Sequence, residues 1–184
     1  MERILIGFVG ASRVGKDTFA AALRKKLLAA NQPAFIKKFG NAVKFVAREE
    51  CQRIHGIDSF TEQNEEKEII RPILEKVGTQ IRQKNPKYLV DVIKASLTDK
   101  GVVIFADLRD SVEAKFIHQQ NGILFKLSRN GVIPRPIEVP FLESVHCDYS
   151  FEVDNYDATY NQKMLDFCVS KIEQQYPLQP LLCT

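Results

Sequence analysis

The chain has 184 residues, of which 45% are hydrophobic and 27% are charged, and its formal net charge is +3. This size suits a globular domain with a substantial core, and so small a charge, mixed in sign along the chain, does not indicate nucleic-acid binding. No apolar run approaches the roughly 18–20 residues that span a bilayer, and a strand pattern begins at once, so we expect no membrane segment and no signal peptide. The four cysteines lie far apart without metal-ligand spacing, which is typical of free thiols in a cytoplasmic protein.

Hydrophobic periodicity and turn residues predict alternating strands and helices. The predicted strands cover residues 4–9, 34–39, 102–106, 123–127 and 149–153. The predicted helices cover about 15–30, 42–55, a segment with Pro72 near its start that ends at about Arg82, 86–99, 111–121 and 158–175. Residues 57–68 are expected to be an exposed connection or a helix start, residues 128–147 irregular, and the tail 177–184 loose.

The most informative stretch is GASRVGKDT at residues 10–18, between the first predicted strand and the first predicted helix. It has the G-x-x-x-x-G-K spacing of a phosphate-binding loop. A helix that opens near Lys16 leaves its first N–H groups unpaired and places partial positive charge there, and a phosphate satisfies both. The alternative is a glycine turn with Lys16 as a solvated surface residue, but the apolar strand before it favours the phosphate site. We expect nucleotide phosphates to bind Gly10, Ala11, Ser12, Arg13, Val14, Gly15, Lys16, Asp17 and Thr18.

The alternation of strands and helices predicts an α/β fold of the three-layer P-loop NTPase type, with a five-stranded, mostly parallel sheet flanked by helices. In such sheets ligands bind beyond the carboxyl ends of the strands. Polar residues follow two further predicted strands, at residues 40–44 and at Asp107 and Arg109. We therefore expect the site at this edge of the sheet.

Several short motifs recur together in one family. They are the G-K-D-T loop at 10–18, Phe39-Gly40-Asn41-Ala42-Val43-Lys44, Arg71 seven residues before Gly78-Thr79, Asp107-Leu108-Arg109, and Asp154-Asn155. In these the chain resembles the P-loop nucleoside monophosphate kinases, most of all the deoxynucleoside monophosphate kinases of tailed bacteriophages and their bacterial relatives. Its G-K-D loop and D-x-R strand end are also similar to animal phosphomevalonate kinase. Ala42 departs from the proline of the family pattern.

The resemblance implies a single kinase domain over residues 1–184 that uses ATP as phosphoryl donor together with Mg²⁺. Lys16 would bridge toward the γ-phosphate. Thr18, Asp17 and Asp107 are the candidates for holding Mg²⁺, directly or through water. The alternative for Asp17 is an acid favoured by the helix dipole, and the alternative for Asp107 and Arg109 is a helix cap and a surface arginine.

The acceptor would bind to Arg109 and to a helical region at about 40–90. Arg71, Gly78 and Arg82 fall at i, i+7 and i+11 on one helical face, where with Thr79 they could form a wall for an acceptor phosphate. Phe39 and Lys44 are further acceptor candidates. The alternative is a solvated basic face with Glu75 and Lys76.

The irregular segment at about 128–147 corresponds to the closing lid of related kinases. Its Arg129, and less strongly Arg135, would face the phosphates, although single loop arginines are often only solvated. By resemblance alone, residues 154–157 would border the adenine.

The predicted function is transfer of the γ-phosphoryl group of ATP to a (deoxy)nucleoside 5′-monophosphate, catalysed with Lys16, Asp107, Arg109 and Arg129. Two alternatives stay open: a kinase of another phosphorylated acceptor such as phosphomevalonate or dephospho-coenzyme A, and a nucleotide-binding module without turnover. Expected partners are small-molecule nucleotides, with no nucleic acid and no membrane, on a monomer or homodimer.

Overall fold

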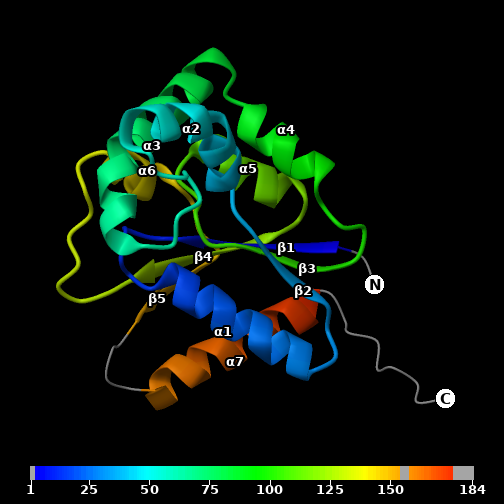
Figure 1. The fold of residues 1–184 in the computed structure, drawn as a ribbon. Helices are drawn as coiled ribbons and strands as arrows, with labels where there is room; N and C mark the ends of the chain where they lie inside the picture. The colour runs from blue at the N-terminus through cyan, green and yellow to red at the C-terminus, as the bar shows by residue number, and fades with distance from the viewer. Residues whose placement is uncertain (1–2, 154–157, 176–184) are drawn as a thin grey trace. The chain divides into compact units, whose positions relative to one another are not determined.

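The structure is a computed structural model that describes residues 3–153 and 158–175. Its strands are β1 (Arg3–Val9), β2 (Ala34–Lys37), β3 (Gly101–Phe105), β4 (Ile123–Ser128) and β5 (Tyr149–Glu152). Its helices are α1 (Lys16–Ala29), α2 (Gly40–His55), α3 (Asn64–Lys84), α4 (Tyr88–Ala95), α5 (Ser111–Gln119), α6 (Val139–Ser144) and α7 (Ala158–Gln175) (Figure 1). The predicted adenine border at 154–157 and the tail at 177–184 lie outside the described residues.

These elements form two compact units. One, the sheet unit, contains residues 1–37 and 97–184, and the other, the helical unit, contains residues 38–96. The helical region expected at about 40–90 thus falls within a unit of its own. Among the described residues, no helix combines the length and the apolar character that crossing a bilayer requires.

The sheet unit is built on five parallel strands in the order β2-β3-β1-β4-β5. β1 is central, and at Gly7 it pairs with Phe105 of β3 on one side and Leu124 of β4 on the other. Its side chains Ile4, Ile6, Phe8 and Val9 are 0% exposed. A strand covered on both faces explains why this stretch reads as continuously apolar rather than alternating.

Helices cover both faces of this sheet (Figure 1). α1 and α7 pack together on one face, and α5 packs on β1 and β4 from the other. The edge of Phe19 in α1 meets the ring of Phe8 in β1, with ring centroids 5.4 Å apart. Because all strands are parallel, their carboxyl ends lie at one edge, where the loop after β1 opens.

The helical unit consists of α2, α3 and α4, which pack on one another. Each contributes apolar side chains at helical spacing, namely Val43, Ala47 and Cys51 from α2, Ile70, Ile73 and Val77 from α3, and Leu89, Val90 and Ile93 from α4. A Cβ on Gly78 would lie 3.1 Å from Nη1 of Arg82, whereas its 3.6 Å distance from Cγ1 of Val43 would be an ordinary van der Waals contact. The glycine therefore leaves room for the Arg82 guanidinium more than for the approach of α2.

Several predicted boundaries differ from the structure. Pro72 is the ninth residue of α3 rather than an early one, because the helix already begins at Asn64, and the proline only removes a bond to the Glu68 carbonyl. α4 begins two residues later than predicted, after a turn in which the Asn85 side chain accepts a hydrogen bond from the Lys87 N–H (3.0 Å), and it ends at Ala95 rather than at about residue 99. Residues 139–144, predicted to be irregular, form α6 with a proline in its first turn.

The helix after β3 is capped by Asp110. The Asp110 carboxylate Oδ1 accepts a hydrogen bond from the Val112 N–H at 2.7 Å. Ser111 is the first helical residue, so its side chain is one position too late to act as the N-cap.

The cap can be tested by substitution. We expect Asp110→Ala to lower the free energy of unfolding by about 1 kcal/mol, because a helix N–H loses its acceptor. Urea unfolding measures this, with Ser111→Ala as the matched control that should change stability little. Equal losses in the two variants would contradict the assignment of the cap.

Candidate functional site

Residues 10–15 form a loop between β1 and α1 that leaves backbone N–H groups available at the start of α1. Gly15 is the N-cap residue in a left-handed conformation (φ 95°) and has no side chain to cap the helix. A Cβ on Gly15 would lie 2.8 Å from Nη2 of Arg129, and one on Gly10 would lie 2.3 Å from the Leu127 carbonyl oxygen. Gly10 is therefore required by its contact with the Leu127 backbone and Gly15 by its left-handed conformation, and the loop has the form of an anion nest at a helix N-terminus.

Lys16 lies across this loop. Its Nζ donates hydrogen bonds to the carbonyl oxygens of Gly10 (2.8 Å) and Ala11 (2.7 Å). Burial, followed by the positive charge of Arg109, lowers the pKa of Lys16 to about 8, while the carboxylates Glu138, Asp17 and Asp107 act in the opposite direction. The structure thus brings three further predicted site residues, Asp17, Asp107 and Arg109, within electrostatic reach of Lys16.

Asp107 and Arg109 follow the carboxyl end of β3. Asp107 is half-buried, whereas the Arg109 side chain is exposed. The Arg109 backbone N–H donates to the carboxylate of Glu113 (2.8 Å), which is itself only 2% exposed. The buried glutamate holds the backbone of this turn and leaves the Arg109 guanidinium at the surface beside the loop.

Arg129, the predicted lid arginine, lies on the loop. Its Nη2 is the atom nearest to the Cβ position of Gly15, and its Nη1 donates a long hydrogen bond to the Arg13 carbonyl (3.5 Å). Arg129 thereby places a guanidinium at the start of α1, and its buried Nε–H has no hydrogen-bond partner among the described residues.

Glu138 contacts the loop at Ser12, and no role for this residue was predicted from the sequence. Its carboxylate accepts hydrogen bonds from the Ser12 backbone N–H (3.2 and 3.3 Å to its two oxygens) and from the Ser12 hydroxyl. It also accepts from the backbone N–H and from Nη2 of Arg135, at 3.0 and 3.3 Å. Burial opposes ionisation, but the hydrogen bonds from Ser12 and Arg135 outweigh it and lower the pKa of Glu138 to about 2. No motif marks this residue, since its contact with Ser12 spans 126 positions.

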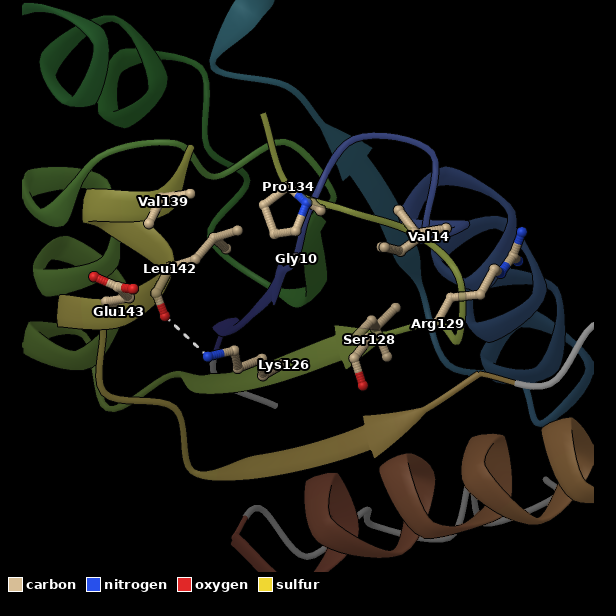
Figure 2. Close-up of a pocket in the computed structure, with 12 residues that line it drawn as sticks. Gly10, Val14, Lys126, Ser128, Arg129, Pro134, Val139, Leu142 and Glu143 are labelled. Carbon is tan, nitrogen blue, oxygen red and sulfur yellow. Dashed lines mark hydrogen bonds between the residues drawn. The ribbon is translucent and has the colours of Figure 1, made fainter. Parts of the chain in front are cut away.

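A cavity of about 470 Å³ opens beside the loop, between β4 and the segment that follows it (Figure 2). Its walls are Gly10, Ala11, Val14, Lys126, Leu127, Ser128, Arg129, Val132, Pro134, Val139, Leu142 and Glu143. Lys126 crosses its floor and donates a hydrogen bond to the Leu142 carbonyl at 2.9 Å (Figure 2). The volume and the largely apolar lining, with a few charged groups, are those of a small-molecule site.

The predicted Mg²⁺ donors are oxygen groups near the loop. Thr18 and Asp17 are exposed in the first turn of α1. Within residues 3–153 and 158–175, no three His, Cys, Asp or Glu side chains form a metal cluster. Mg²⁺ keeps several waters and takes few protein ligands when it binds with phosphates, so the hydroxyl and carboxylate donors here fit it, and their role stays a prediction.

The predicted acceptor residues of α3 lie in the helical unit. Arg71 makes a double hydrogen bond to Glu68 (2.9 and 2.6 Å), and the Thr79 hydroxyl donates to the Glu75 carbonyl (2.8 Å). Nη1 of Arg82 lies over Gly78 and donates to its carbonyl at 3.3 Å.

Phe39 and Lys44 are the two acceptor candidates from the start of this unit, and Lys44 is half-buried. Phe39 is only 1% exposed and belongs to the core. The Lys44 Nζ lies 5.5 Å from the ring centroid of Phe60. The acceptor role of all six residues in this unit stays a prediction.

Comparison with known proteins supports the fold. No protein-family model matches the sequence, and a search of curated proteins finds no significant match. Among solved structures, the APS kinase CysC of Mycobacterium tuberculosis in complex with AMPPNP and APS is 13% identical over 91% of this chain and 98% of its own, with a TM-score of 0.52. Shikimate kinase from Bacteroides thetaiotaomicron is 15% identical over 92% of this chain and 98% of its own, with a TM-score of 0.46. The fold assignment relies on the first of these: the predicted fold class is confirmed, and the chain has the α/β fold of P-loop kinases.

The Glu138 contact predicts a specific pH dependence of stability. The pKa of Glu138 is depressed to about 2 from an ordinary value of 4.5, so its contribution is present above about pH 5 and is lost as the pH falls toward 2. We expect Glu138→Gln to lower the free energy of unfolding by on the order of 2–3 kcal/mol at pH 7 and by progressively less toward pH 2. Urea unfolding across this range measures the effect, with Glu143→Gln as the control. A constant offset from pH 7 to pH 2 would contradict the prediction.

Proposed function

We propose that this protein is a P-loop kinase that transfers the γ-phosphoryl group of ATP, with Mg²⁺, to a (deoxy)nucleoside 5′-monophosphate. The observation that carries the proposal is the charge cluster around the loop, where Lys16 lies within reach of Asp107 and Arg109. The family motifs in the sequence favour a nucleotide acceptor. The fold likeness to an APS kinase that holds AMPPNP is consistent with ATP as the donor.

The donor half of the site follows from the loop. Backbone N–H groups of residues 10–15 and the first turn of α1 would surround the β-phosphate, and Lys16 would exchange its hydrogen bonds to loop carbonyls for bonds to phosphate oxygens. The Arg129 guanidinium already lies at Gly15, and its Nε–H, which has no partner among the described residues, could donate to a phosphate oxygen. Bound Mg²⁺ would neutralise charge on the β- and γ-phosphates. The nucleoside would find room in the adjoining cavity.

Arg109 is the residue that we assign first to the acceptor side of the proposed site. Its charge acts on Lys16, so we propose that the two cations contact phosphates on either side of one transferring group. A second anion beside the loop needs such a cation, whereas a protein that only binds ATP does not. The placement of Arg109 therefore favours an acceptor that already carries a phosphate.

A coupled assay of ADP release tests the proposal directly. The acceptors would be the four deoxynucleoside monophosphates and their ribose counterparts, with phosphomevalonate, dephospho-coenzyme A and shikimate as competitors of other classes. We expect turnover with at least one nucleoside monophosphate. Turnover only with another acceptor would move the chain to a different kinase class, and tight ATP binding without any turnover would make it a binding module.

Substitution of Lys16 tests the loop. We expect Lys16→Ala to lower kcat by about a hundredfold or more, because losing one electrostatic transition-state contact costs on the order of 3–4 kcal/mol. The control is Lys25→Ala, which removes an exposed lysine from the same helix. A kcat close to that of the wild type would refute the donor assignment.

Substitution of Arg109 separates the two halves of the site. We expect Arg109→Ala to raise KM for the acceptor by at least tenfold and to change KM for ATP much less, because a phosphate contact is lost only on the acceptor side. Lys115→Ala, which removes an exposed charge from α5, is the control. An effect confined to ATP would place Arg109 on the donor side.

A further inference from the structure

The anion nest of the loop already holds an anion that belongs to the chain. Ser12 is in the middle of the loop, and both its backbone N–H and its hydroxyl donate to the Glu138 carboxylate. A phosphate bound in the usual way at such a loop would need donors of this kind. Glu138 and a bound phosphate therefore compete for the same hydrogen bonds.

We propose that Glu138 is an internal substitute for phosphate that nucleotide must displace from Ser12, and that it sets the affinity of the loop for nucleotide. The inference rests on the proposed function, since it assumes that the loop binds nucleotide phosphates. It adds a residue that the sequence motifs do not mark.

Charge makes the two occupants mutually exclusive. Glu138 is one of the carboxylates that raise the pKa of Lys16, so its negative charge acts on the lysine that would contact the γ-phosphate. A polyphosphate at the loop would meet this carboxylate at close range, and like charges at such separation repel. A polyphosphate offers more charge and more acceptor oxygens than one carboxylate, so it can replace Glu138.

Displacement of Glu138 also affects the segment that carries it. The same carboxylate accepts the backbone N–H and Nη2 of Arg135, so Arg135 is held by the group that leaves. Two large apolar side chains of this segment, Ile133 and Ile137, are 87% and 63% exposed and anchor it little. The contact with Ser12 therefore joins residues 129–138, which also supply cavity walls, to the loop.

Binding measurements on Glu138 variants test this inference. We expect Glu138→Ala to bind ATP with Mg²⁺, and inorganic pyrophosphate alone, about ten- to a hundredfold more tightly than the wild type, the effect of removing one charge-assisted competitor. Glu138→Gln keeps the shape without the charge and should be intermediate. Isothermal titration calorimetry gives the Kd values, and Glu152→Gln, which alters an exposed carboxylate of β5, should match the wild type.

The outcomes separate the two proposals. Unchanged or weaker binding of both probes to folded Glu138→Ala and Glu138→Gln would overturn the competition, and weaker binding would instead make Glu138 a ligand of the bound nucleotide or its metal. Failure of the wild type and of both variants to bind either probe would overturn the proposed function of the loop itself. Urea unfolding of each variant at pH 7 shows that the protein measured is folded.

Discussion

The rest of the sheet unit depends on one electrostatic requirement, which is that the start of α1 needs an anion. The helix opens on a glycine without a capping side chain, and Lys16 and Arg129 add full positive charges there. Water can satisfy such groups only in part, because Lys16 is held against loop carbonyls and its pKa is lowered by burial. Glu138 supplies negative charge there and joins the segment after β4 to the loop through Ser12.

The topology of the sheet determines where the positively charged start of α1 lies. β1 is buried on both faces and paired on both sides, so the loop after it emerges at the middle of the carboxyl edge. β3 pairs directly with β1 and ends at the same edge, which brings Asp107 and Arg109 beside the loop. β4 pairs with it on the other side and delivers Arg129. Three neighbouring strands thus bring together charges that lie about a hundred residues apart in the chain.

What could be predicted from the sequence was local. The order of strands and helices and the phosphate loop are encoded within short windows, and the Asp107–Arg109 pair is marked by its place after an apolar strand. Glu138 could not be found this way, because its contact with Ser12 joins segments 126 positions apart and no periodicity leads into it. Pro72 misled the prediction for a different reason: proline is typical of the first turn of a helix, but α3 begins eight residues earlier, at Asn64, and contains the proline.

An internal carboxylate in a phosphate site carries an energetic trade-off. Without Glu138, the loop would keep the positive charges of Lys16 and Arg129 but lose the carboxylate that now bonds Ser12. Under the proposed function, Glu138 would stabilise the empty loop, and a nucleotide would first have to break its bonds to Ser12. Stability without ligand and affinity for ligand are therefore opposed through a single side chain. A site arranged in this way is ordered before the nucleotide arrives and changes its contacts, rather than its fold, when the nucleotide binds.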